Sequence, residues 1–544
     1  DSTANVLNAW IDFDQDGDGY LCNFFFDGLN GCGWLLGTDC DDLDSDLSPE
    51  TLWYQDIDFD DYGDPMKFNQ QCLQPDGSVF NLDDCDDGEI SIDDDCAPPL
   101  VGGGFPAMYG NEAGMYFGEV LGAGKLNADS YPDLVVASSV KESVYVFYGP
   151  MPDDDVGSLD DVAPDLTWSA KNVGFGRMVL ASNVHGSGAD DLVFSTTWFD
   201  DLYIVDGYID SVEGDIVLDS DLLIHGAANT GFGFHAAAVG DLDQDLINEM
   251  LIAGPDYETA TGAVYLAFSS PVGATKELDF DDIGVAYFGE NTGDEAGHDL
   301  HGGYDVDGDG MGDMVVGAPY YATDAGKAYL LFGADQLTGG MLVDADGVLA
   351  GEEDYEHLGY SVLTSKDFNG DGYGEVLFGV PGYDDGWGRT YLFYGGDDVA
   401  QKVNSGAPDV EFELAVAQEP GPAVGSELES LDFNGDGRAD LLIGAVNFDP
   451  YGAEGEAGMG AVYLYMGQVN LSGVVDLSGA FQAFHGPEFE DAAMGYRRTI
   501  MPIGDVDQDS RHDFVISAPG AGSQMGAGED LGVVFLVPAA KFVG

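Results

Sequence analysis

One pattern recurs seven times along this chain of 544 residues and fills it from about residue 103 onward. Each copy has a dipeptide ending in Gly, an Asp-rich loop, two apolar runs, and a fourth short segment before the next copy. The loops open at residues 125, 183, 241, 305, 367, 432 and 505, so the copies lie 58 to 73 residues apart. Four short β-type runs per copy, joined by turns, are typical of a propeller blade, whose apolar faces must stack against neighbouring blades.

The seventh copy ends after its second apolar run, at 533–538, and lacks the fourth run. Residues 103–112 are similar to that missing run, as comparison with residues 481–490 shows. We therefore predict an all-β fold over residues 101–544: a seven-bladed β-propeller with four-stranded blades, closed by the N-terminal strand. The alternative is an open solenoid, and a chain that stops in mid-blade argues against it.

Five of the Asp-rich loops carry oxygen-bearing side chains at relative positions 1, 3, 5 and 9. Such hard oxygen donors in a short loop suit Ca²⁺, and none of them is a His or Cys that zinc or copper would favour. We predict about five structural Ca²⁺ ions in the propeller. The candidate ligands are Asp241, Asp243, Asp245 and Glu249; Asp305, Asp307, Asp309 and Asp313; Asp367, Asn369, Asp371 and Glu375; Asp432, Asn434, Asp436 and Asp440; and Asp505, Asp507, Asp509 and Asp513.

Two loops depart from this pattern. The first blade's loop has Lys125, Asn127, Asp129 and Asp133 at the four positions, and its lysine places a cation where a ligand should be. The second blade's loop has Asn183, His185, Ser187 and Asp191, with a single carboxylate. We predict no Ca²⁺ in the second loop, and the lysine argues against one in the first.

Residues 1–100 differ in composition from the repeats and form a predicted second domain. All six cysteines lie there, at Cys22, Cys32, Cys40, Cys72, Cys85 and Cys96. An even number in one short segment indicates disulfides formed in an oxidising compartment, although six cysteines allow 15 pairings and the sequence does not choose among them.

Two diverged copies of one acidic unit make up this Cys-rich and Asp-rich module, at residues 10–50 and 53–96. We predict at least two further Ca²⁺ ions in it; an acidic disulfide-linked loop without a specific metal is the alternative. The first copy fits in part, because Tyr20 stands at position 9, and an EF-hand is disfavoured by Asn23 at its bidentate position. The candidate ligands are Asp12, Asp14, Asp16 and Asp18 in the first copy, and Asp56, Asp58, Asp60 and Asp64 in the second.

The charge of the chain excludes several classes of partner. It has 102 Asp+Glu against 15 Lys+Arg, a formal net charge of −87, and such a surface repels nucleic acid and anionic lipid. No apolar run reaches about 18 residues, so we expect no membrane insertion. Because the chain begins at Asp1, we interpret it as a processed, exported form: a secreted or cell-surface protein whose signal peptide has been removed.

These motifs resemble the FG-GAP repeat propeller, which forms the head of integrin α subunits and occurs in many bacterial secreted proteins. The resemblance covers residues 103–544 and is carried by Phe117-Gly118, by Gly317-Ala318-Pro319 and by the Asp-rich loop at 305–313. The two N-terminal copies resemble a metal-binding repeat of bacterial secreted multidomain proteins. The resemblance implies the fold far more specifically than the function, because propellers serve binding, scaffolding and catalysis.

Three functions are compatible with these patterns. We predict a non-catalytic binding or adhesion protein that recognises a protein or glycan ligand at the cell surface. The first alternative is a self-assembling subunit of a surface layer or filament, a Ca²⁺-dependent homo-oligomer bridged by the N-terminal module. A polysaccharide-acting enzyme on a propeller scaffold is less favoured, since no GxSxG, HExxH or P-loop motif occurs and only His298 and His301 suggest a paired transition-metal site.

Overall fold

The computed structural model describes residues 106–542, except for 113, 128, 152–162, 170–174, 187–188, 197–199, 208–212, 216–219, 269–276, 281–283, 335, 415–420, 449–459, 486–497 and 520–531. Of the first hundred residues it describes three strands. The chain divides into two compact units, Asp1–Pro98 and Pro99–Gly544.

The N-terminal unit contains a small antiparallel sheet in the order β2-β1-β3. Its strands are β1 (Leu52–Gln55), β2 (Asp64–Gln70) and β3 (Ser78–Val79). Asp64 is the first residue of β2, whereas the other predicted N-terminal ligands and all six cysteines lie outside the described residues. The predicted disulfides and the metal loops of this unit therefore stay predictions.

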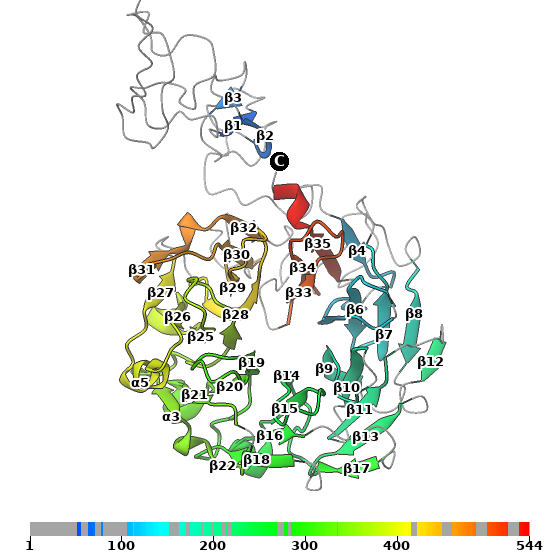
Figure 1. Cartoon of the computed structure of the whole chain (residues 1–544), viewed down its shortest axis with the longest axis vertical. Helices are drawn as coiled ribbons and strands as arrows, with labels where there is room; N and C mark the ends of the chain where they lie inside the picture. The colour runs from blue at the N-terminus through cyan, green and yellow to red at the C-terminus, as the bar shows by residue number, and fades with distance from the viewer. Residues whose placement is uncertain are drawn as a thin grey trace, which may run out of the picture. The chain divides into compact units, whose positions relative to one another are not determined.

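Seven sheets surround a common centre in the second unit, as the strand labels in Figure 1 show. Each sheet is an antiparallel meander whose first strand lies nearest the centre. The strands of blades one to three are β5 (Val120–Gly124), β6 (Asp133–Ser138), β7 (Ser143–Phe147) and β8 (Leu166–Ser169); β9 (Phe175–Ser182), β10 (Asp191–Thr196), β11 (Asp201–Val205) and β13 (Leu222–His225); and β14 (Ala236–Gly240), β15 (Glu249–Gly254), β16 (Ala263–Ala267) and β18 (Gly284–Phe288).

Blades four to seven repeat the same plan. Their strands are β19 (Leu300–Tyr304), β20 (Asp313–Ala318), β21 (Lys327–Leu331) and β23 (Gly347–Ala350); β24 (Val362–Ser365), β25 (Glu375–Val380), β26 (Arg389–Phe393) and β27 (Val410–Glu413); β28 (Val424–Leu431), β29 (Asp440–Ala445), β30 (Ala461–Tyr465) and β32 (Gln482–His485); and β33 (Ile500–Gly504), β34 (Asp513–Ala518), β35 (Val533–Val537) and β4 (Ala107–Tyr109).

The ring closes as the sequence predicts. Strand β4, from the start of the propeller sequence, is the outermost strand of the seventh blade and pairs antiparallel with β35. The register places Tyr109 opposite Val533 and Ala107 opposite Phe535. The predicted seven-bladed, four-stranded, all-β fold closed by an N-terminal strand is confirmed.

Four sheets carry a fifth, outer strand that the repeat pattern did not indicate. These strands are β12 (Glu213–Asp215), β17 (Glu277–Asp279), β22 (Gly340–Met341) and β31 (Gly473–Asp476). Each belongs in sequence to one blade but pairs in parallel with the outer strand of the preceding blade, as β31 does with β27. The strands thus tie neighbouring blades together by backbone hydrogen bonds as well as by packing.

Helices are short and lie in the connections. The α-helical segments are α2 (Tyr257–Ala260), α3 (Tyr321–Asp324), α4 (Tyr383–Gly386) and α5 (Val399–Ser405). The 3₁₀ turns are η2 (Leu342–Asp344), η3 (Leu477–Gly479) and η4 (Ala539–Phe542). Segments α2 and α3 contain residues with positive φ, such as 44° at Glu258 and 50° at Ala322, so they are tight turns rather than regular helices.

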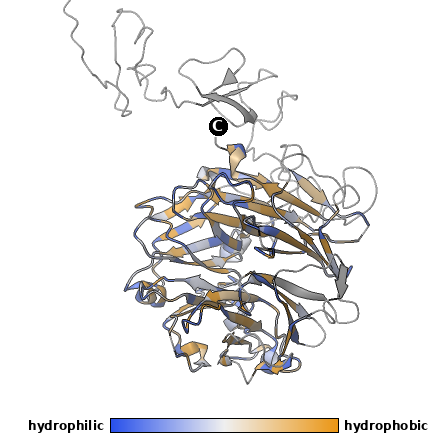
Figure 2. Ribbon diagram, turned by 45° about the vertical axis from the view of Figure 1, so that its right-hand side comes forward, coloured by the Kyte–Doolittle hydropathy of each residue, from blue (hydrophilic) through white to orange (hydrophobic). Residues whose placement is uncertain are grey.

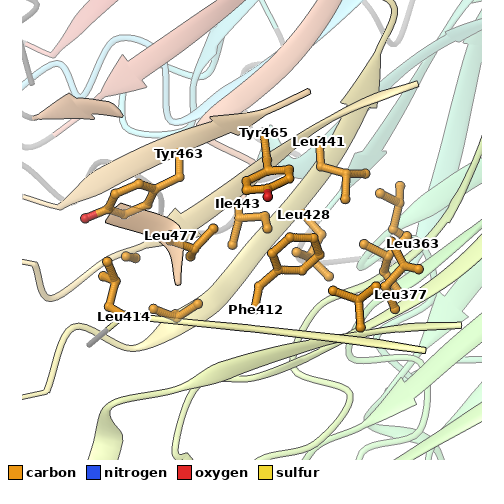
Figure 3. Packing of buried hydrophobic residues seen from close by; sticks show 14 of the residues in the cluster. Leu363, Leu377, Phe412, Leu414, Leu428, Leu441, Ile443, Tyr463, Tyr465 and Leu477 are labelled. Atoms are coloured by element: carbon orange, nitrogen blue, oxygen red, sulfur yellow. The ribbon is translucent and has the colours of Figure 1, made fainter. Parts of the chain in front are cut away.

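The core lies between the blades. Every residue of the second strand of each blade is buried, because a strand packed between two sheets must be apolar on both faces. Figure 2 shows that hydrophobic residues follow these strands. Between blades five and six, Leu377 and Phe412 of one blade pack with Leu428, Ile443 and Tyr465 of the next (Figure 3).

Close backbone approach between blades explains two of the recurring glycines. Gly359, at the start of the fifth blade, has φ +81° and donates its N–H to the carbonyl oxygen of Gly379 at 3.0 Å. A Cβ atom on Gly317 would lie 1.9 Å from the carbonyl oxygen of Gly359. Glycine at both positions therefore lets two blades meet backbone to backbone.

Candidate metal centres

Each Asp-rich loop joins the first and second strands of its blade, and position 9 is the first residue of the second strand. In the fourth blade's loop, Gly308 and Gly310 donate their N–H groups to the carboxylate of Asp305 at 2.6 and 2.8 Å. The N–H of Asp309 donates to Asp307, and that of Met311 to Asp309. The backbone therefore winds around the side chains at positions 1, 3 and 5 and holds them on its inner side.

Four of the five predicted loops bring three carboxylates together. In each group the ligand atoms lie within 4.8 Å of one another, which is close enough to share one cation. The groups are Asp241, Asp243 and Glu249; Asp305, Asp307 and Asp313; Asp367, Asp371 and Glu375; and Asp505, Asp507 and Asp509. Of the other predicted ligands in these loops, Asp245, Asp309, Asn369 and Asp513 occupy their expected loop positions but are not members of those groups.

The sixth blade's loop is different. Asp432, Asp436 and Asp440 form no such group, and the Asp436 carboxylate lies 3.5 Å from the guanidinium of Arg438. Asn434 holds the loop turn by accepting the N–H of Asp436 at 2.8 Å. One oxygen of Asp432 is nevertheless buried without a hydrogen-bond partner.

Unsatisfied oxygens test whether a cation fits these loops. Oε1 of Glu375 is buried and has no hydrogen-bond partner, like the oxygen of Asp432. Burial raises the pKa of Glu375 to about 9, and the nearby Asp367 and Asp371 carboxylates add to the increase. Buried acceptors that lack donors and repel each other are stabilised by a divalent cation, and an all-oxygen donor set fits Ca²⁺.

Position 9 has a role that the ligand pattern did not reveal. In the fourth blade, the Asp313 carboxylate is fully buried and accepts the N–H groups of Val306 at 2.6 Å and Gly333 at 2.8 Å. It therefore ties the loop to the end of the third strand. Burial raises the pKa of Asp313 to about 7 despite these hydrogen bonds.

The two departing loops keep this tie. Asp133 accepts the N–H groups of Leu126 at 2.7 Å and Gly149 at 3.0 Å. Asp191 accepts that of Val184 at 2.9 Å and that of Gly207 at 3.1 Å. Position 9 is acidic in all seven loops, including those that lack the other ligands, and this signal in the sequence could have identified the structural role.

A second group of ionisable side chains was not predicted from the sequence. The first strands of the blades enclose a central cavity of about 510 Å³. Its lining includes Asp299, Glu427 and Glu429, together with His301 and Arg498. Asp299 pairs with His235 at 2.9 Å, and Glu427 accepts the N–H groups of Thr499 and Ile500.

His298 and His301, the His pair that the sequence analysis noted, do not form a metal centre among the described residues. His298 packs against the rings of Phe234, Tyr320 and Tyr360, with ring centroids 5.2 to 6.0 Å apart. His301 lies beside the Thr364 hydroxyl at 3.1 Å, and burial lowers its pKa to about 4. Neither belongs to a cluster of metal-ligating groups.

The central acids predict a pH-dependent stability. Burial raises the pKa of Glu427 to about 8; burial followed by repulsion from Glu427 and Asp299 raises that of Glu429 well above its usual range. A carboxyl whose folded-state pKa is raised stabilises the fold fully below its ordinary pKa of 4.5 and loses that contribution as the pH rises. Glu429→Gln should therefore raise the free energy of unfolding by about 2 kcal/mol at pH 8 and by much less at pH 5.

Denaturant unfolding at both pH values in the same Ca²⁺ buffer measures this difference. Asp354→Asn, at an exposed position, is the matched control and should change stability by less than about 0.5 kcal/mol at either pH. An equal effect of Glu429→Gln at pH 5 and pH 8 would contradict the inference that the pKa of Glu429 is raised in the folded protein.

Among the described residues, no helix has the length and apolar character that crossing a membrane requires. The fold and its acidic loops define a class: seven-bladed β-propellers with Asp-rich loops between the first and second strands. Residues 296–331, 358–396 and 424–465 match the FG-GAP repeat family. Blades four to six of this seven-bladed propeller thus carry FG-GAP repeats, which the resemblance implied.

The known proteins that are similar to parts of this chain include a phospholipase D and an integrin α subunit. Phosphatidylinositol-glycan-specific phospholipase D of Bos taurus is 34% identical over 183 residues, 32% of this chain and 20% of that protein. Integrin alpha-5 of Xenopus laevis is 29% identical over 220 residues, 37% of this chain and 20% of that protein. The solved structure "Crystal structure of BBS1N in complex with ARL6DN, soaked with lead" has a TM-score of 0.41 at 9% identity, over 77% of this chain and 91% of that chain. The alignments thus span about a fifth of the length of the two curated relatives.

Proposed function

We propose that this chain is an extracellular, Ca²⁺-stabilised propeller that acts as a non-catalytic binding or adhesion module. The similarity of its FG-GAP repeats to an integrin α subunit is the observation that carries this proposal. The phospholipase D alignment, like the integrin alignment, covers 20% of the relative, and we propose no enzymatic activity because no GxSxG, HExxH or P-loop motif occurs in this chain. The relatives also motivate the secreted or cell-surface location.

Ca²⁺ would be held by the five predicted loops, with the three clustered carboxylates of four of them, which include the buried oxygen of Glu375, as the best-supported donors. The ions would supply charge neutralisation and rigidity rather than chemistry. The N-terminal module, residues 1–100, would carry further ions and disulfides and act as a stiff attachment or docking piece.

The ligand face is proposed at the end of the blades opposite the acidic loops. The second strand of each blade runs from position 9 to the next turn, so the turns that contain α2, α3 and α4 lie at the other end of that strand. Each of these turns begins with a tyrosine: Tyr257, Tyr321 or Tyr383. Tyr355 lies beside the α3 turn, donates its N–H to the Thr323 carbonyl oxygen, and is 60% exposed. Exposed tyrosines supply large contact areas at a low entropy cost.

Two measurements test the proposal. Light scattering in a few mM Ca²⁺ and in excess EGTA should give a monomer near 57 kDa in both. Binding to glycan arrays and to purified extracellular matrix proteins should then fall at least about tenfold in Tyr355→Ala, a loss of more than 1 kcal/mol. Phe481→Ala, another exposed aromatic residue, is the control and should leave binding unchanged.

Other outcomes would point elsewhere. High mass in Ca²⁺ that collapses in EGTA would support the self-assembling alternative, in which divalent ions bridge strongly acidic subunits. Equal loss of binding in Tyr355→Ala and Phe481→Ala would contradict the proposed face. Turnover of a polysaccharide that single substitutions abolish would overturn the non-catalytic assignment.

A further inference from the structure

The loop of the second blade has lost the Ca²⁺ pattern but gathers a different set of ligands. One ring nitrogen of His185 and one carboxylate oxygen each of Asp191 and Asp206 lie within 4.8 Å of one another. His185 is at position 3 of the loop after β9, Asp191 begins β10, and Asp206 directly follows β11. Three separate segments of the blade therefore converge on one point.

The backbone fixes this convergence. Asp191 accepts the N–H of His185 at 2.8 Å with one oxygen and the N–H of Gly207, the neighbour of Asp206, at 3.1 Å with the other. The N–H of Asp206 donates to the carboxylate of Asp221 at 3.0 Å. The Asp191 carboxylate thus holds the backbone of His185 and that of Gly207, the neighbour of Asp206, at one point.

Two polar atoms in this cluster are buried and lack partners. They are Nδ1 of His185 and Oδ1 of Asp206. A buried polar atom without a partner costs about 1–3 kcal/mol, so such atoms are rare and call for an explanation. A carboxylate oxygen and a neutral imidazole nitrogen are both acceptors, and a cation, a proton or a water molecule between them would satisfy both.

Comparison among the seven blades shows that both residues are specific to this blade. Position 3 is Asn or Asp in the other six loops: Asn127, Asp243, Asp307, Asn369, Asn434 and Asp507. The counterparts of Asp206 are Tyr148, Phe268, Phe332, Tyr394, Met466 and Pro538, none of which is acidic. The single His and the single acid thus occur together in one blade, at positions that meet in space.

We propose that His185, Asp191 and Asp206 bind a divalent transition metal of the Zn²⁺ or Co²⁺ type. Imidazole nitrogen combined with carboxylate oxygen suits these ions, whereas Ca²⁺ takes six to eight oxygen ligands. One oxygen of Asp191 accepts two backbone N–H groups, from Val184 and His185, and the other accepts that of Gly207, so the carboxylate positions the cluster as well as belonging to it. The second blade has exchanged its metal preference rather than lost it.

The test uses the full chain, stripped with chelator, dialysed, and saturated with Ca²⁺ so that the all-oxygen loops are filled. Co²⁺ is then titrated and followed by its visible d–d absorption, and bound Co²⁺ is counted by elemental analysis. Thiolate-to-metal bands in the ultraviolet identify any Co²⁺ held by the cysteines of the N-terminal unit. We expect one Co²⁺ without thiolate bands that excess Ca²⁺ does not displace and Zn²⁺ does.

We choose variants that introduce the residues found at the equivalent positions of other blades, and we expect them to retain the fold. His185→Asn introduces the residue of the first and fifth loops, and Asp206→Tyr introduces the residue that precedes the equivalent glycine in those two blades. Each should lower the affinity for Co²⁺ at least about 100-fold. His225→Gln is the control, since His225 pairs with Asp201 at 2.9 Å outside the cluster, and it should retain the site.

Three results would overturn the proposal. The first is equal Co²⁺ stoichiometry in His185→Asn and His225→Gln. The second is displacement of Co²⁺ by Ca²⁺. The third is failure of the unsubstituted protein to bind this Co²⁺ in the titration. In that case a proton or a water molecule shared between His185 and Asp206 would be the partner of their two buried acceptor atoms. Thermal melting of each variant in Ca²⁺ without Co²⁺ verifies that folding is retained.

Discussion

Removal of Ca²⁺ with excess EGTA should lower the free energy of unfolding of the propeller by roughly 9 kcal/mol. A loop with a dissociation constant of about 0.1 mM gains about 1.8 kcal/mol at roughly 2 mM Ca²⁺, and five independent loops contribute together. Such a loss is comparable to the whole stability of an ordinary domain. Denaturant unfolding in Ca²⁺ and in EGTA measures it, and unchanged unfolding would show that the loops do not bind Ca²⁺ in this range.

Single substitutions distinguish the contribution of the bound ions to stability from that of the hydrogen bonds within the loop. Asp309→Ala removes the position 5 carboxylate of a loop with the full pattern, and it should reduce the Ca²⁺-dependent part of the stability by about one fifth. Asp129→Ala is the matched control at position 5 of the first loop. The two share a loop hydrogen bond, since Asp129 accepts the N–H of Tyr131 at 2.8 Å and Asp309 that of Met311. Asp129→Ala should lower stability equally in Ca²⁺ and in EGTA.

The fold could be predicted in detail because the repeat carries its own periodicity. Seven copies, each too apolar to stand alone, require a closed ring, and the incomplete last copy identified β4 as the closing strand. The outer strands β12, β17, β22 and β31 were not predicted. They are two to four residues long, lie on the polar rim, and form because a neighbouring blade offers an open edge, which no local pattern reports.

The candidate site likewise has features that could be predicted from the sequence and features that could not. The carboxylate groups of four loops could be predicted because their members lie within one stretch of nine residues, where spacing in sequence fixes spacing in the structure. The central acids could not, because Asp299 and Glu427 come from blades four and six and meet only when the ring closes. The tie at position 9 was missed for another reason: its partner Gly333 is 20 residues away, and a carboxylate among other carboxylates was interpreted solely as a metal ligand.

Loss of the position 9 carboxylate should be the most damaging single change in the propeller, with or without Ca²⁺. Asp133 is fully buried, and both of its oxygens accept backbone N–H groups, from Leu126 and Gly149. Asp133→Asn turns an amide donor toward one of these N–H groups and removes the charge that strengthens both bonds. We expect the free energy of unfolding to fall by about 3–5 kcal/mol at neutral pH.

The same substitution in two different blades distinguishes the hydrogen-bonding role of position 9 from its role as a metal ligand. Because the first loop lacks the full ligand set, Asp133→Asn should cost the same in Ca²⁺ and in EGTA. Asp313→Asn, at position 9 of the fourth blade, should cost more in Ca²⁺ than in EGTA, since it removes the same tie and weakens an ion site as well. Asp354→Asn, which is exposed, should change neither value by more than about 0.5 kcal/mol. If Asp133→Asn were as mild as Asp354→Asn, position 9 would act through the metal alone, and the hydrogen bonds in the first two blades would carry little energy.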